Sequence, residues 1–148
     1  MTALVSCAPM PVAVDAPAPE GAAATACQRL AQQLPETLDG LERRDVEPRT
    51  LTAAAWGEPP VVMRCGVPPP TALRPTSELF VVNGIDWFAE PLQGGAQQRG
   101  VRFTTTGRVA NITVTVPAAH APEADVLVDL AAPVAAAVPP VPPVPPAQ

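Results

Sequence analysis

The sequence contains neither lysine nor tyrosine, and histidine occurs once. Its nine basic residues are all arginine, and 14 aspartates and glutamates give a formal net charge of −5 at pH 7. Nucleic-acid binding relies on a basic patch that neutralises phosphates, so we expect no nucleic-acid partner. Long apolar runs are missing too, since no stretch reaches the ~18 apolar residues typical of a membrane-spanning helix. We therefore expect contact with a membrane only through a lipid anchor.

The shortage of histidine and cysteine restricts catalysis and metal binding. A cysteine nucleophile needs a neighbouring base, and the one imidazole is that of His120 in the loop PAAHAPE. A structural zinc site needs four ligands at recognisable spacing, which three isolated cysteines and one histidine do not supply. A thioredoxin-type redox site has no Cys-x-x-Cys motif here. We predict no catalytic residue, no metal and no cofactor.

Proline, in contrast, is abundant, with 22 residues in a chain of 148. A chain of this length accommodates one domain. The C-terminal sequence VPPVPPVPPAQ is poor in the backbone donors that helices and sheets require, which predicts an extended polyproline II segment. The composition therefore divides the chain into a disordered N-terminal segment (1–11), a single domain (12–132) and a Pro-rich tail (133–148).

The N-terminal segment contains a short match to a bacterial lipobox, Leu4-Val5-Ser6-Cys7. In a lipobox, a signal peptidase cuts before the cysteine, which then carries lipid. A true lipobox follows a basic region and an apolar region, whereas three residues precede this one. Two interpretations stay open: a start codon placed too late, with Cys7 as the lipidation site, or a chance cysteine in a disordered end.

Two segments carry apolar residues at helical spacing. The first lies within residues 19–36, and Pro35 ends it because proline disfavours the α region for the preceding residue. The second lies within residues 121–134. The positions expected to face inward are Ala23, Cys27, Leu30, Ala31 and Leu34 in the first helix and Leu127, Leu130, Ala131 and Val134 in the second.

Between the helices, alternation of apolar and polar residues predicts antiparallel strands. Residues 38–48 predict a turn and a short charged strand. Residues 51–67 predict two strands around the turn Gly57-Glu58-Pro59, and Cys65 shares one face of the second strand with Val61 and Met63. Cys65 therefore points toward the core.

Two hairpins follow. Asn83-Gly84 is a preferred pair for a type I′ turn, and it would place Phe80 opposite Trp87. The second hairpin, over residues 100–116, centres on Gly107-Arg108 and pairs Thr106 with Val109. Its alternation predicts one core face and one wet face. The core face carries Val101, Phe103, Ile112 and Val114, and the wet face carries Arg102, Thr104, Thr106, Asn111, Thr113 and Thr115.

One helix precedes the run of strands in the sequence and one follows it. This order predicts an α+β fold, in which an antiparallel sheet built from hairpins has two helices packed on one face. The other face would present hydroxyl and guanidinium groups suited to a glycan or a carboxylate. The candidate binding residues are Arg102, Thr104, Arg108 and Asn111. The alternative is a solvated face that is rich in threonine because threonine favours strands.

Cys27 and Cys65 both lie on faces expected to be buried. They are either two free thiols or the halves of one disulfide. Inward positions on elements that pack together favour the disulfide, as does an oxidising compartment if the protein is exported. We predict the Cys27–Cys65 disulfide, which would stabilise the fold by about 4 kcal/mol in the chain-entropy model. Cys65 is then structural.

Five stretches occur in the order CQRLAQQLPETLDGLERR, AAAWGEPPVVMRCGV, NGIDWF, RFTTTGR and ITVTVP. Together they resemble the DUF3515 family, a set of small exported or lipid-anchored actinobacterial envelope proteins of unknown function. The resemblance covers roughly residues 12–132, and the block from Trp56 to Val67 is its most specific part. Family genes tend to lie near the ligase that joins D-alanine to D-alanine, which associates the family with the cell wall.

The resemblance implies an exported envelope protein, secreted or lipid-anchored. We expect a non-enzymatic accessory protein that binds a ligand or glycan, acts as a monomer and has a cell-wall or envelope component as its partner. The alternative is a hydrolytic enzyme of cell-wall metabolism. Such an enzyme would need paired carboxylates in a cleft, such as Asp86 with Glu90 or Glu58.

Overall fold

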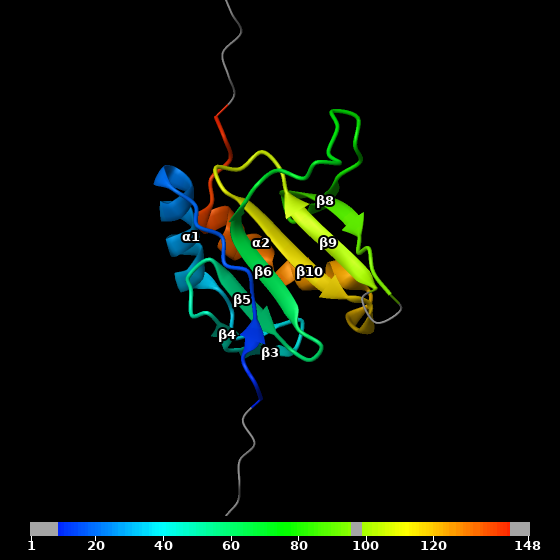
Figure 1. The fold of residues 1–148 in the computed structure, drawn as a ribbon. Helices are drawn as coiled ribbons and strands as arrows, with labels where there is room; N and C mark the ends of the chain where they lie inside the picture. The colour runs from blue at the N-terminus through cyan, green and yellow to red at the C-terminus, as the bar shows by residue number, and fades with distance from the viewer. Residues whose placement is uncertain (1–8, 96–98, 143–148) are drawn as a thin grey trace, which may run out of the picture.

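The computed structural model describes residues 9–95 and 99–142, and in this part of the chain two α-helices cover one face of an eight-stranded antiparallel sheet (Figure 1). The strand order is β2-β3-β5-β6-β10-β9-β8-β7. The strands are β2 (Thr37–Leu38), β3 (Leu41–Arg44), β5 (Ala53–Trp56), β6 (Val61–Val67), β7 (Phe80–Val82), β8 (Ile85–Pro91), β9 (Gly100–Thr105) and β10 (Asn111–Pro117). A separate parallel pair joins β1 (Val12–Ala13) to β4 (Val46–Glu47). The predicted α+β fold is confirmed.

The helices α1 (Gly21–Gln33) and α2 (Val126–Ala137) pack against each other behind the sheet (Figure 1). Two 3₁₀ turns, η2 (Ala118–His120) and η3 (Glu123–Asp125), lead into α2. All four predicted inward positions of α2 are buried, as are Cys27 and Leu30 of α1. No helix within the described residues is long and apolar enough to cross a membrane.

The central strands follow the predicted alternation. Buried and half-buried residues alternate along Val61–Val67, with Cys65 on the buried face and Arg64 on the other. Trp56 at the end of β5 is fully buried, and its indole N–H donates to the carbonyl oxygen of Pro35 at 3.0 Å. This hydrogen bond fixes the chain after α1 against the sheet.

The first hairpin also has its predicted geometry. Asn83 and Gly84 both have positive φ angles, of 48° and 85°, as a type I′ turn requires. Phe80 pairs with Trp87, and Trp87 is fully buried. Phe80 lies on β7 at the edge of the sheet and is 52% exposed.

The register of the second hairpin differs from the prediction. Thr113 pairs with Thr104, so the strands are offset by two residues from the expected pairing of Thr106 with Val109. Side chains alternate with a period of two, and an offset of two therefore leaves the paired residues of the two strands on their predicted faces. Phe103 accordingly remains buried.

The turn is longer than predicted because its residues form backbone hydrogen bonds with residues 139–141. The N–H of Val109 donates to the carbonyl of Pro139 at 3.1 Å, and the N–H of Val141 donates to the carbonyl of Gly107 at 2.8 Å. Arg108 and Pro140 form a β-bridge between these two contacts. In the expected two-residue turn, the N–H of Val109 would instead donate to the carbonyl of Thr106 and could not pair with Pro139.

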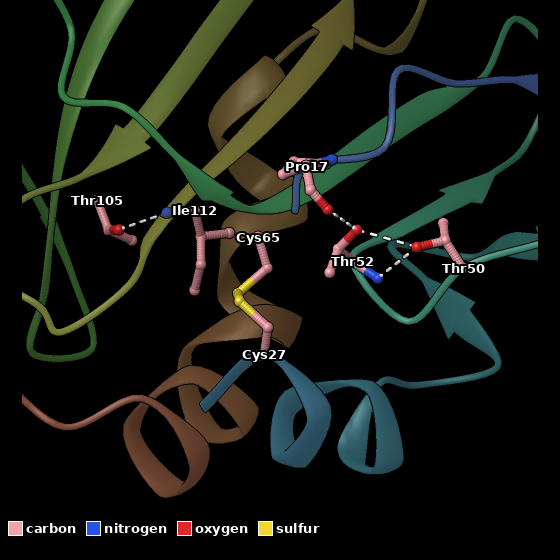
Figure 2. The surroundings of a disulfide bond; sticks show 7 residues. All are labelled: Pro17, Cys27, Thr50, Thr52, Cys65, Thr105 and Ile112. Carbon is pink, nitrogen blue, oxygen red and sulfur yellow. Dashed lines mark hydrogen bonds between the residues drawn. A yellow bond between two sulfur atoms is a disulfide. The ribbon is translucent and has the colours of Figure 1, made fainter. Parts of the chain in front are cut away.

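A side chain supports the end of β10 where its pairing is irregular. The register of β10 against β6 shifts between Asn111 and Ile112. The N–H of Ile112 donates to Oγ1 of Thr105 at 2.9 Å, and both residues are buried (Figure 2). Thr105 thus supplies an acceptor where the sheet ladder is disrupted.

Residues 133–138, which were expected to begin the Pro-rich tail, belong to the folded domain instead. Pro133 lies inside α2, which continues to Ala137, and Val138 is fully buried. The inward apolar face of α2 favours continuation of the helix, and residues 138–141 then pack on the 107–109 turn. Residues 143–148 lie outside the described part of the chain.

The segment that precedes α1 crosses the sheet face opposite the helices (Figure 1). Thr52 Oγ1 donates to the carbonyl of Pro17 at 2.7 Å (Figure 2). Arg64 Nε donates to the carbonyl of Asp15 at 2.8 Å. Pro19 lies so close to Gly66 that a Cβ atom there would approach it to 2.6 Å. This segment therefore covers β5 and β6 and leaves β9 and β8 uncovered.

Candidate functional site

The predicted disulfide between Cys27 of α1 and Cys65 of β6 is formed, and it joins the helix layer to the middle of the sheet (Figure 2). Both residues are buried, and their Cα atoms are 5.7 Å apart. A bridged sulfur is neither a nucleophile nor a free metal ligand, so Cys65 is structural. Disulfides are typical of oxidising compartments, which indicates a non-cytoplasmic protein. Cys7, the predicted lipidation site, lies outside the described residues.

The outer face of the sheet brings polar side chains from four strands together. One row runs from Thr104 on β9 through Thr113 on β10 to Arg64 on β6. Arg102 lies two residues before Thr104 on β9, on the same face, and it pairs with Glu90 on β8. Side chains directly opposite each other on neighbouring strands stand about 4.5–5.5 Å apart. These five residues therefore form one compact cluster.

A hollow of about 270 Å³ lies over this cluster. Thr104 and Thr113 line it from the sheet, together with Val67 at the end of β6 and the loop of residues 68–71 that follows. The prediction of a wet face is wrong here, because Thr104 and Thr113 are only 1% and 7% exposed and share the hollow with this loop. Three consecutive prolines in the loop, residues 68–70, present apolar surface and carbonyl acceptors but no backbone donors.

Charged groups surround the hollow. Arg102 Nη2 lies 3.3 Å from Glu90 Oε2, and Arg64 Nη2 lies 3.3 Å from Asp15 Oδ2. Arg102 donates to Glu90 Oε2 through Nε and Nη2, whereas Arg64 donates to the backbone carbonyl of Asp15 through Nε and to its carboxylate through Nη2. Nη1 of each arginine makes no hydrogen bond to another described residue. The ion pairs orient the guanidinium groups, while one end of each remains available to a ligand. The site thus combines donors, acceptors and hydroxyl groups.

Two of the four predicted binding residues lie elsewhere. Arg108 Nη1 donates to the carbonyl of Val138 at 2.6 Å, so this guanidinium holds the C-terminal segment. Asn111 is half-buried opposite Val67 and does not line the hollow. The structure therefore brings Arg102 and Thr104 together but separates Arg108 and Asn111 from them.

Arg64 and Glu90 belong to the cluster although neither was among the predicted binding residues, and Glu90 was named only as a candidate carboxylate of the alternative hydrolase. Alternation along β6 already places Arg64 on the outer face, and Glu90 shares the outer face of β8 with Asp86. Local alternation does not reveal that β6 lies beside β10, which is what brings Arg64 to Thr113. That adjacency is the information the sequence pattern lacked.

Among the carboxylates considered for a hydrolase, Asp86 and Glu90 are well separated along β8, and both glutamates contact arginines. Asp86 and Glu90 lie four residues apart on β8, which separates their backbones by about 13 Å at the rise of a strand. Glu90 contacts Arg102, and Glu58 contacts Arg44, with Nη1 2.7 Å from Oε2. Each of the two glutamates therefore faces an arginine rather than a second acid.

The family model described as "Protein of unknown function (DUF3515)" matches residues 2–143, nearly the whole chain. No curated protein and no solved structure matches the sequence. The matched region includes the disulfide and every residue that lines the hollow.

Proposed function

We propose that this chain, which belongs to the DUF3515 family, is a non-enzymatic binding protein of the cell envelope that holds a hydroxyl-rich ligand in the hollow on its outer sheet face. The observation that carries the proposal is the cluster of Thr104, Thr113, Arg64, Arg102 and Glu90 beside a wall of prolines. The cluster is a built arrangement, because four strands and two ion pairs position its members.

The chemistry of the hollow favours a glycan fragment with a nearby carboxylate. Threonine hydroxyls donate and accept hydrogen bonds, as sugar hydroxyls do. The free ends of Arg64 and Arg102 suit a carboxylate, and Glu90 offers an acceptor to a hydroxyl or amide. A volume of about 270 Å³ is slightly below the usual range for drug-sized ligands, so we infer that the hollow takes about one sugar ring. Cell-wall glycan that carries peptide carboxylates has this chemistry.

The disulfide supports the envelope as the location of this protein. A buried bridge between two layers of the fold persists in an oxidising compartment, as the outside of a cell provides. Attachment of lipid to Cys7 in Leu4-Val5-Ser6-Cys7 would hold the protein at a membrane surface. Secretion without lipid is the alternative, and detergent partitioning of the native protein separates the two.

The binding proposal is tested with purified peptidoglycan and its soluble fragments. Thr104→Val and Thr113→Val preserve the side-chain shape and remove one hydroxyl each, so each should weaken binding several-fold. Thr115→Val is the matched control, because Thr115 lies on the same face of β10 but does not line the hollow. Equal binding by all three folded variants, or no binding by the unmodified protein, would refute the site.

A further inference from the structure

A larger groove, of about 710 Å³, lies between the C-terminal end of α1 and the residues that lead from β3 to β5. These elements lie together at the left of the molecule in Figure 1. The groove shares no lining residue with the hollow on the outer face. Three of the nine arginines of the chain line it, and they are Arg43, Arg44 and Arg49.

Two of these arginines are available to a ligand. Arg44 is already engaged, since its Nη1 donates to Glu58 Oε2 and its Nη2 donates to the carbonyl of Met10, both at 2.7 Å. Arg43 and Arg49 make no side-chain hydrogen bond or ion pair with any residue in the described ranges. The groove also contains two carboxylates, Glu36 and Asp45, and neither forms an ion pair with an arginine there.

The position of Arg43 is fixed by an aromatic ring. Its guanidinium carbon lies 5.2 Å from the ring centroid of Trp56, which is fully buried. A guanidinium stacked on a ring keeps its edge donors free, and those donors match the oxygens of a carboxylate or phosphate. Arg43 is therefore held in place before any ligand binds.

Apolar side chains form the rest of the groove. Leu34, Val46 and Leu51 line it together with alanines. Leu51 is 59% exposed, which is a large exposure for a leucine beside two cationic groups. A groove with unpaired cations and an aliphatic wall suits a ligand that is anionic at one end and apolar at the other.

We propose that this groove binds an anionic amphiphile. Its carboxylate or phosphate would lie against Arg43 and Arg49, and its alkyl chain would lie along Leu34, Val46 and Leu51. Such a ligand is either a free single-chain molecule or the headgroup region of a lipid in a membrane. The site does not depend on the proposed binding of a glycan at the outer face.

Nuclear magnetic resonance of the two tryptophan indole groups tests the proposal. The Trp56 indole N–H donates to Pro35, which lies between two lining residues of the groove, Leu34 and Glu36. Addition of dodecanoate or dodecyl phosphate below the micelle concentration should shift the Trp56 signal and leave that of Trp87 in place. Trp87→Phe assigns the signals. Dodecyl maltoside, with the same chain and a neutral head, and acetate, with no chain, should bind at least tenfold more weakly.

Substitutions separate the groove from general charge effects. Arg49→Gln changes an exposed residue and should weaken dodecanoate binding about tenfold, as loss of a charged hydrogen bond does. Arg43→Gln should weaken dodecanoate binding similarly. Leu51→Ser should weaken the binding of dodecanoate but not the binding of acetate. Arg29→Gln, an equal change of charge at an exposed position of α1 outside the groove, is the control.

The results have distinct meanings. Unchanged affinity in both Arg43→Gln and Arg49→Gln, equal binding of the neutral maltoside, or no shift of Trp56 with either anion would each overturn the proposal. Sedimentation with vesicles of anionic or zwitterionic phospholipid then identifies the source. Binding to anionic vesicles that is lost in Arg49→Gln indicates a membrane headgroup, whereas binding of the single-chain anions alone indicates a free ligand. Thr104→Val should affect none of these measurements, so failure at one site is distinguishable from failure at the other.

Discussion

At the scale of single residues, the two tryptophans occupy similar buried positions but differ in one hydrogen bond. The indole N–H of Trp56 has an acceptor in the carbonyl of Pro35. That of Trp87 is buried and has no partner within the described residues. A buried donor without an acceptor carries a desolvation penalty of about 1–3 kcal/mol. The indole N–H of Trp56 should therefore contribute more to the stability of the fold than that of Trp87.

We therefore expect Trp56→Phe to destabilise the protein more than Trp87→Phe. Both substitutions remove similar apolar volume, but only the first breaks a hydrogen bond and leaves the Pro35 carbonyl unpaired. The difference in the free energy of unfolding should be about 1–2 kcal/mol. Urea denaturation followed by circular dichroism measures it. Equal losses in the two variants would show that the hydrogen bond of Trp56 contributes nothing to stability.

The disulfide gives a second prediction at this scale. Intact mass should fall short of the reduced mass by two hydrogens, and alkylation without reductant should label no cysteine other than Cys7, whose thiol is free only where no lipid is attached. The bridge closes a loop with a sequence separation of 38 residues, so its removal in Cys27→Ala/Cys65→Ala should cost about 4 kcal/mol of stability in the chain-entropy model. Three reactive thiols in protein recovered from its native compartment would contradict the bridge.

At the scale of elements, the segment before α1 depends on a close contact with β6. Gly66 has a φ of 96°, and a Cβ atom there would lie 2.6 Å from Pro19. Gly66→Ala combines backbone strain with this clash, and we expect a loss of about 2–4 kcal/mol. Gly84→Ala is the control, because φ is also positive there but nothing lies within 4 Å.

Limited proteolysis distinguishes the two glycine variants further. Displacement of Pro19 in Gly66→Ala should expose the segment before α1 to cleavage, whereas Gly84→Ala should lose about 1 kcal/mol and keep that segment protected. If both variants lose the same stability and show the same cleavage pattern, the contact with Pro19 is not what holds the segment.

The C-terminal end of α2 and the residues after it form the second element with a testable role. Deletion of residues 138–148 removes the buried Val138 and leaves Arg108 and the Val109 N–H without their acceptors. We expect the thermal midpoint to fall by about 10 °C, which corresponds to roughly 3 kcal/mol for a domain of this size. Deletion of residues 143–148 alone preserves these contacts and is the control. An unchanged midpoint in the longer deletion would mean that the segment is dispensable.

At the scale of the whole molecule, the sequence predicted those features that depend on local chemistry. The type I′ turn at Asn83-Gly84 follows from the two positive φ angles that this pair tolerates, and the inward position of Cys65 follows from alternation along its strand. The burial of Thr104 was not predictable in this way. It depends on which side chains and loops of distant parts of the chain meet around the hollow, and no local pattern encodes that arrangement. The burial of Val138 was not predicted either. The proline-rich composition of residues 133–148 predicted a tail, although α2 includes Pro133 and continues to Ala137.

The described chain enters and leaves the molecule at opposite ends (Figure 1), so tension between those ends would pass through the sheet. The bridge from Cys27 to Cys65 spans a sequence separation of 38 residues and removes that part of the chain from the length that tension can extend. At about 3.4 Å per residue, this withholds roughly 130 Å of contour length from forced unfolding. Chemical reduction should restore that length in single-molecule stretching. A domain attached at both ends would therefore extend less when force unfolds it while the disulfide is intact.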